Sequence, residues 1–403
     1  MTEEIAAIYS KLGSIRKPLV SLIVVNWNYA RFVRDTIKSI AEQSYRRFEC
    51  LVIDNGSDDD SATAIGAQIE GDARFRLERL SNNIGHLGAG LWSLDKVKGD
   101  FIVFVDADDL LFSNYLTSHL QVHLAARYST AFTSSNIVEM NSAGSIIGGG
   151  CRPLSRACFH RPEGMRSWSD TAQMSIISEQ RHQALANATR YVPPDVKGWV
   201  WGPGTSNMYR RQLLLAFTPT LRDPLRFGGI DCFFNPILHS ITGTTLIDVP
   251  LSAYRIHGAN DYTRLPSMSG IHSGTKEAEI RNSGIIRLAA ATVIETADAF
   301  TQMVGSKRFW QALDVIAHLH GNWPNMYSHF DIRRVIVDNF QRLKRLFGDG
   351  ELQRELRARM QLVDYSRCIK EAHGDRFKVA TQCRILGLQV KHIIEQYWCG
   401  VIT

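Results

Sequence analysis

The chain has 403 residues, of which 44% are hydrophobic and 21% charged, and its formal net charge at pH 7 is +6. These values are ordinary for a soluble globular protein with one large domain or two to three smaller ones. No run reaches the roughly 18 apolar residues of a membrane-spanning helix, and the N-terminus lacks the basic and apolar segments of a signal peptide. The seven cysteines form no C-x-x-C pair, and the sequence has no nucleic-acid-binding motif. We therefore expect a cytoplasmic protein without a disulfide framework.

The first quarter of the chain alternates apolar runs with segments of helical spacing. The apolar runs predict buried strands over residues 20–25, 48–53, 74–80 and 101–105. Between them, apolar residues at helical spacing predict helices over residues 30–43, 61–70 and 86–98. This alternation is typical of a parallel sheet with crossover helices. Sheets of this kind bind their ligands outside the carboxyl ends of the strands.

Carboxylates stand at the carboxyl ends of two of these strands. The fourth strand runs directly into Asp106, Asp108 and Asp109, and the second is followed at once by Asp54. Two like charges about 5 Å apart repel by about 3 kcal/mol at an effective dielectric of about 20, so the cluster favours a hard cation with oxygen ligands. A polar turn that caps the next helix is the alternative. No G-x-G-x-x-G follows a strand and no Walker A motif is present, which disfavours a dinucleotide or P-loop site.

The remainder of the chain becomes increasingly helical. We expect a helix over residues 113–128, strands over 130–134, 137–147, 246–249 and 251–254, and an irregular basic insert over 148–197. Helical patterns then extend over residues 276–304, 307–320, 331–347, 351–373 and 376–398. The last of these carries an apolar seam with heptad spacing. The seam is compatible with packing on this chain, with a homodimer, or with peripheral contact with a membrane.

Four segments of the first quarter match one family together. In order they are VSLIVVNWNYARFVRDTIKSIAEQSY, FECLVIDNGSDDDS, NNIGHLGAGLW and GDFIVFVDADDLL, across roughly residues 19–112. Their succession resembles the family 2 glycosyltransferases, which are inverting enzymes of GT-A fold. The resemblance implies an α/β fold with a Rossmann-like mixed sheet and flanking helices. It implies a catalytic domain at 1–265, with a nucleotide-binding half at 19–112 and an acceptor half at 113–265, and a mainly α-helical C-terminal region at 266–403.

The resemblance also implies which residues hold the donor. Asp106 and Asp108 match the D-x-D motif, which holds Mn²⁺ or Mg²⁺ against the diphosphate of a nucleotide sugar. His257, in Tyr254-Arg-Ile-His-Gly, matches a motif whose histidine can complete the metal site, and Arg255 is a candidate phosphate contact. The implied nucleotide contacts are Val25, Asn26, Trp27, Asn28, Asp54, Asn83, Gly85, Asp106 and Ala107. For Trp27, stacking on the base and packing at the rim of the core both remain open.

Three further residues are implied on the acceptor side. Asp231 stands where the family has a general base, which takes the proton of the attacking hydroxyl on the face opposite the leaving group. The family usually has Glu-Asp at this point, whereas this chain has Ile230-Asp231, and capping of a helix is the alternative role. Trp199 and Trp201 are candidate acceptor contacts, because indole faces suit the C–H faces of sugars. Core packing is the alternative for both.

The implied reaction is a metal-dependent, inverting transfer of a sugar from a nucleotide donor, expected to be a UDP-sugar. The implied acceptor is a hydroxyl of a glycan or lipid-linked glycan, as in cell-surface polysaccharide biosynthesis, which would bring the protein to the inner face of the plasma membrane. A sugar-1-phosphate nucleotidyltransferase is one alternative, although it usually carries a Gly-rich loop with Arg and Lys after the first strand. A non-catalytic glycan- or nucleotide-binding protein is the other, and the intact set of acids argues against it.

Overall fold

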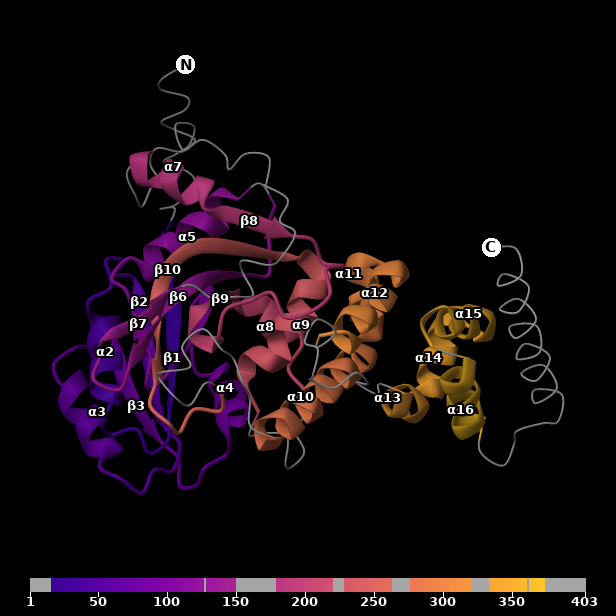
Figure 1. The fold of residues 1–403 in the computed structure, drawn as a ribbon, viewed down its shortest axis with the longest axis horizontal. Coiled ribbons are helices and arrows are strands. Elements are labelled where there is room, and N and C mark those ends of the chain that lie inside the picture. Colours follow the sequence, from indigo (N-terminus) through magenta and orange to yellow (C-terminus); the bar gives the residue numbers. More distant parts are fainter. Residues whose placement is uncertain are drawn as a thin grey trace, which may run out of the picture.

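A computed structural model describes residues 16–126, 128–149, 179–219, 228–262, 276–319, 333–360 and 362–373. Within these ranges, a mixed β-sheet with helices on both faces forms one part of the molecule, and helices alone form the other (Figure 1). The α/β fold with a helical C-terminal region is therefore confirmed.

The first four strands form the parallel half of the sheet. They are β1 (Val20–Asn26), β2 (Phe48–Asp54), β3 (Phe75–Arg79) and β4 (Phe101–Asp106), in the spatial order β3-β2-β1-β4. The crossover helices are α2 (Val33–Ala41), α3 (Ser61–Ile69) and α4 (His86–Ser93), so the predicted alternation is confirmed. The register pairs Asn26 with Asp54 and Val25 with Asp106. The polar ends of three strands therefore meet at one edge of the sheet.

Each strand of this half divides its side chains between two hydrophobic layers, as the two-residue period of a strand requires. In β1, Leu22 and Val24 belong to the layer that contains α2, α3 and α5 (Tyr115–Ala125). Ile23 belongs to the opposite layer, with α4 and α9 (Ile230–Thr242). Because both faces are covered, the strands read as continuous apolar runs in the sequence.

Beyond β4 the sheet continues with strands of both directions. β9 (Asn207–Arg210) is antiparallel to β4 and to β6 (Phe132–Asn141), and β6 is parallel to β10 (Thr244–Ile256). Shorter strands complete it, namely β5 (Leu110–Leu111), β7 (Ile146–Gly149) and β8 (Thr189–Val192). The sequence predicted two strands in place of β6 and two in place of β10. That prediction is wrong for β10 because register shifts on both sides of Pro250 carry the strand past the proline.

Three short elements link the strands of this second half. They are α7 (Glu179–Asn187), which packs on α5, the 3₁₀ turn η2 (Gly204–Ser206), and α8 (Arg211–Ala216). The turn η2 lies against β4, β6 and β10, so it stands at the same edge of the sheet as the strand ends. Most of the predicted insert at 148–197 lies outside the described residues.

The helical region begins directly against α9 of the sheet-containing part. Its helices are α10 (Lys276–Glu295), α11 (Ala297–Val304), α12 (Ser306–Ala317), α13 (Arg333–Asp338), α14 (Phe340–Phe347), α15 (Asp349–Arg359) and α16 (Leu362–His373). Figure 1 shows α10 and α12 beside α9, and α14 to α16 farther out, with α13 between. The predicted helices are divided more often than the sequence suggested. For example, the helix predicted over residues 276–304 consists of α10 and α11, and that predicted over 331–347 consists of α13 and α14. Gly305 and Gly348, with φ of +83° and +78°, end α11 and α14 where the predicted helices also end.

Helices α9, α10 and α12 share one hydrophobic cluster, so the proposed division at residue 265 does not separate two cores. The contact is close where Gly228 precedes α9, because a Cβ on Gly228 would lie 2.1 Å from Cγ1 of Ile285 in α10. The predicted seam at 376–398 lies outside the described residues. Among the described residues, no helix combines the length and apolar character that crossing a membrane needs.

Candidate active site

Asp106, at the end of β4, is held by side chains from two elements, α4 and η2. Its Oδ1 lies 3.1 Å from Nε2 of His86, the first residue of α4. Its Oδ2 accepts a 3.4 Å hydrogen bond from the Thr205 hydroxyl in η2. The same hydroxyl accepts a 3.1 Å bond from the Asp106 backbone N–H. The carboxylate therefore has a fixed orientation, with one oxygen toward α4 and the other toward η2.

Asp231, in the first turn of α9, faces the same gap as Asp106. A Cβ built on Gly204 would lie 3.3 Å from Oδ2 of Asp106 and 4.0 Å from Cγ of Asp231. The missing side chain at Gly204 thus leaves room between the two acids. Burial and the neighbouring charge of Asp106 raise the pKa of Asp231 to about 6, against a smaller lowering by His86. A carboxylate with such a pKa is a stronger base near neutral pH than an ordinary aspartate.

His86 itself lies in the field of all three acids of this centre. Burial lowers the pKa of His86, but its bond to Asp106 and the charges of Asp231 and Asp108 outweigh burial, so the pKa is raised. A cationic group at this point offsets part of the repulsion between carboxylates that converge on one gap.

Asp108 and His257 form a second pair beside the first. His257 Nε2 lies 2.8 Å from Oδ2 of Asp108, and the two side chains are 4% and 9% exposed. The Ala259 backbone N–H donates to His257 Nδ1 at 3.4 Å, which leaves Nε2 to donate to Asp108, and a cation bound at Nε2 would displace that proton. Burial raises the pKa of Asp108, the bond from His257 opposes this, and the charge of Asp106 adds to it. The Tyr29 ring stands edge-on to the His257 ring at 5.4 Å.

The donor set of Asp108 and His257 fits a divalent cation that also binds a diphosphate. Their facing atoms are 2.8 Å apart, close to the roughly 3 Å between neighbouring ligands of an octahedral cation with bonds of about 2.1 Å. Among the described residues, no three carboxylate, imidazole or thiol groups form a complete metal cluster. Mg²⁺ is usually held by one or two carboxylates together with substrate phosphates, so an incomplete protein set is what such a site requires.

Asp109 and Arg255 support the acidic loop from behind. Asp109 Oδ1 accepts a 3.0 Å bond from the Arg255 backbone N–H, and Arg255 Nε donates to the Asp108 carbonyl at 2.7 Å. The Arg255 side chain is 2% exposed and its other end lies 3.4 Å from Asp35. Burial, followed by the charges of Asp108 and Asp106, raises the pKa of Asp109 well above its usual range. The predicted phosphate contact by Arg255 is therefore wrong, because the guanidinium is buried under the loop.

Two loops at the nucleotide edge are tied together by short polar side chains. Ser57 Oγ accepts bonds from the Asn26 side-chain amide at 3.2 Å and from the Asn28 backbone N–H at 3.0 Å. Asn28 has a φ of +60°, which asparagine tolerates better than most residues. Between them Trp27 is 49% exposed, so its ring is free to contact a ligand. Asn26 is fully buried, which leaves backbone atoms as its means of contact, and its role at the nucleotide stays a prediction.

The other predicted nucleotide residues are mostly buried. Val25 and Ala107 are 8% and 1% exposed, which leaves backbone atoms as their means of contact. Asp54 is 2% exposed, and its Oδ2 lies 3.8 Å from Nε of Arg79. Its role in recognising the base stays a prediction.

Asn83 and Gly85 shape the turn before α4. Asn83 Oδ1 accepts bonds from the Asn55 side-chain amide at 3.0 Å and from the Gly85 backbone N–H at 2.8 Å. Gly85 has a φ of +81°, a conformation that favours glycine. These bonds set the direction in which His86 leaves the turn.

The two tryptophans predicted on the acceptor side differ in their surroundings. Trp201 has no exposed surface, and its indole N–H donates to the Thr244 hydroxyl at 2.9 Å. Its predicted acceptor role is wrong, because no face of the ring is left for a sugar. Trp199 is partly exposed and stands edge-on to Trp201 at 5.0 Å, so its role stays a prediction.

Sequence reasoning missed His86, Thr205 and Gly204. His86 lies within the segment NNIGHLGAGLW, but its spacing from the acids carries no signal because the contact forms only when α4 meets β4. The run Trp201-Gly-Pro-Gly-Thr205 marks a turn, which could have indicated a close approach of the backbone.

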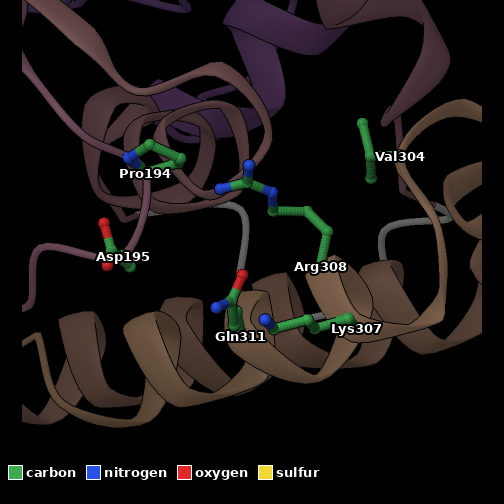
Figure 2. Close-up of a pocket in the computed structure, with 6 residues that line it drawn as sticks. All are labelled: Pro194, Asp195, Val304, Lys307, Arg308 and Gln311. Atoms are coloured by element: carbon green, nitrogen blue, oxygen red, sulfur yellow. The ribbon is translucent and has the colours of Figure 1, made fainter.

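A hollow of about 370 Å³ lies elsewhere, between the loop after β8 and the start of α12 (Figure 2). It is lined by Pro194, Asp195, Val304, Lys307, Arg308 and Gln311. None of these residues belongs to the acidic centre. The lining carries the negative charge of Asp195 beside the positive charges of Lys307 and Arg308, so it does not favour one sign of ligand. We therefore assign the chemistry to the acids and not to this hollow.

Comparison with known proteins bears first on the fold of the chain and then on the family of its N-terminal part. TarS of S. aureus, solved in complex with UDP-GlcNAc, shares the fold with a TM-score of 0.52 at 12% identity, over 91% of this chain and 92% of that chain. The architecture is thus the GT-A fold. The family model described as "Glycosyl transferase family 2" matches residues 21–144. Residues 21–144 therefore match the family 2 glycosyltransferases, as the four motifs indicated.

Relatives of known sequence match over different shares of this chain and of their own length. An uncharacterised glycosyltransferase of Nostoc is 24% identical over 266 residues, which is 65% of this chain and 72% of that protein. The Escherichia coli UDP-Glc:alpha-D-GlcNAc-diphosphoundecaprenol beta-1,3-glucosyltransferase is 30% identical over 125 residues, 31% of this chain and 48% of that enzyme. The chain spans 43–61% of the length of other leading relatives.

Proposed function

We propose that this protein is an inverting, metal-dependent glycosyltransferase that moves a sugar from a UDP-sugar to a hydroxyl group. The observation that carries the proposal is the arrangement around Gly204. Asp231, with a raised pKa, faces Asp106 across the space beside this glycine, and the Asp108–His257 pair lies on the same acidic loop. A base on one side and a diphosphate-binding group on the other are what a single displacement requires.

Asp231 acts as the general base in this proposal. It accepts the proton of the acceptor hydroxyl while that oxygen forms its bond to the anomeric carbon and the bond from that carbon to the diphosphate breaks. A pKa near 6 leaves Asp231 mostly ionised at neutral pH, so it is ready to accept a proton. The same pKa makes Asp231 basic enough to keep the proton that it takes from the acceptor hydroxyl. Its position in the first turn of α9 fixes the base on a rigid element.

Asp108 and His257 hold the Mn²⁺ or Mg²⁺ ion, with Asp106 beside them as a further carboxylate. Such an ion neutralises the negative charge that develops on the departing diphosphate. Trp27 stacks on the base, and Asp54 accepts a hydrogen bond from it. The preference for UDP is supported by the donor in the name of the Escherichia coli relative and by the ligand of TarS.

The acceptor is proposed to be a glycan or lipid-linked glycan, in the context of cell-surface polysaccharide biosynthesis. The acceptor named for the Escherichia coli relative, a diphosphoundecaprenol-linked sugar, supports this class. A lipid-linked acceptor would bring a cytoplasmic protein to the inner face of the plasma membrane. Trp199 remains the proposed acceptor contact, and the segment 376–398 the proposed element of a homodimer or membrane contact.

Calorimetry with UDP tests the donor site directly. UDP should bind the protein more tightly with Mn²⁺ than without it, and Asp108→Ala should remove the difference. Asp95→Ala is the matched control, because the Asp95 side chain is 79% exposed and lies in the turn after α4. UDP binding that ignores both Mn²⁺ and the Asp108→Ala change would overturn the proposed metal site.

A further inference from the structure

We propose that His86 is a positioning residue of this centre: its Nε2–H bond to Asp106 Oδ1 aims the other oxygen of Asp106 into the gap that Asp231 faces. The proposal rests on the proposed function, because it assigns His86 a task in the transfer reaction. It adds a residue that lies on α4, outside the D-x-D motif, the base helix and the Tyr254-Arg-Ile-His motif.

The first step of the argument is the orientation of the Asp106 carboxylate. Its two oxygens have separate partners, His86 at 3.1 Å and Thr205 at 3.4 Å. The oxygen bonded to Thr205 is also the one that lies 3.3 Å from the Cβ position of Gly204. The bond to His86 is the shorter of the two, and its imidazole donor, unlike the Thr205 hydroxyl, carries a charge when protonated, so it is the stronger restraint on rotation about the Cβ–Cγ bond.

The second step is that His86 is itself held in place. Its neighbour Leu87 donates its backbone N–H to the Gly228 carbonyl at 3.1 Å, immediately before the helix that carries Asp231. On the other side, the turn bonds of Asn83 and Gly85 fix the start of α4. The imidazole is therefore a rigid link between the segment that precedes the base and the carboxylate opposite it.

The third step excludes a role in packing alone. The His86 side chain is 30% exposed, whereas Leu87, the next residue of α4, is fully buried. A partly exposed imidazole at the mouth of a site adds little to the hydrophobic core. The imidazole instead bonds to Asp106, one of the acids that converge on the gap beside Gly204.

The test is a double-mutant cycle between His86→Ala and Asp106→Asn, with His86→Gln as the conservative variant. Glutamine carries a side-chain N–H donor at a similar reach, so it can restore the bond without the ring. We expect His86→Ala to lower kcat/KM for the donor by about 10- to 100-fold and His86→Gln to recover most of the loss. In the Asp106→Asn background, His86→Ala should cause almost no further loss, because His86 acts through Asp106. His318→Ala, at an exposed histidine that directly follows α12, is the control.

The affinity for UDP with Mn²⁺, measured for the same four proteins, provides a second cycle that does not require turnover. Additive losses in both cycles would overturn the positioning role while the proposed function stood. The positioning role would also be overturned if His86→Ala lowered the Tm, His86→Gln did not restore it, and both variants kept the wild-type kcat/KM. If the wild-type protein binds UDP but transfers no sugar, the proposed function fails, and the affinity cycle still decides whether His86 and Asp106 are coupled.

Discussion

Replacement of Asp231 by asparagine should make the protein more stable and much less active. The pKa of Asp231 is raised from 3.8 to about 6, which means that folding penalises the ionised form. A shift of about two units corresponds to about 3 kcal/mol. Asp231 keeps part of its surface exposed, and solvent reduces the cost, so we expect a gain of about 1 to 3 kcal/mol for Asp231→Asn at pH 8.

The size of this stability gain depends on pH. The carboxyl group binds its proton more tightly in the folded protein, so the penalty is fully present above about pH 6 and disappears below the unfolded value of 3.8. The stability gain of Asp231→Asn should therefore be largest at pH 8. At pH 4 the same linkage leaves a gain of about 0.5 kcal/mol. Urea unfolding at the two pH values, without metal or nucleotide, measures it.

The control for this experiment is Asp95→Asn, an exposed carboxylate whose replacement should change stability by less than about 0.5 kcal/mol at either pH. Transfer activity of Asp231→Asn should fall by about 10²- to 10⁴-fold, because the base is lost while UDP affinity is kept. An unchanged or lower stability at pH 8, or turnover equal to that of the wild type, would refute the account of Asp231.

The remaining predictions concern pH and the two aromatic residues. In the metal-free form Asp231 has a pKa of about 6. The rate of transfer at low metal concentration should therefore fall about tenfold per pH unit below pH 6. A rate that does not fall between pH 6 and pH 4 would contradict this. Trp27→Ala should weaken UDP binding by about 1–3 kcal/mol and leave the Tm unchanged, since half of the ring is already exposed. Trp201→Ala should do the opposite, with a loss of about 3–5 kcal/mol of folding free energy, and calorimetry with thermal melts separates the two.

Sequence patterns predicted the parallel half of the fold well because its information is local. Strands buried on both faces are continuous apolar runs, and each is followed by a helix whose spacing is evident. Because the register aligns the strand ends, the position of Asp106 beside the first strand also followed from the switch-point rule. The placement of Asp231 came from the family resemblance and not from spacing.

The errors arose where distant segments meet. Pro250 would normally end a strand, yet the partner β6 continues across it, and only the pairing reveals this. For Trp201 the sequence left acceptor contact and core packing both open, and only the fold shows that Thr244 and His239 from other elements enclose the ring. The role proposed for His86 depends on its contact with Asp106, 20 positions away in the chain. This contact forms only where the start of α4 meets the end of β4.

The most direct test of the central claim is an anomalous-difference map of the protein crystallised with UDP and Mn²⁺. The account predicts a manganese peak bonded to Asp108, with His257 beside it, and UDP with its base over Trp27. UDP bound away from this acidic edge, or manganese bound without contact to Asp108, would contradict the account.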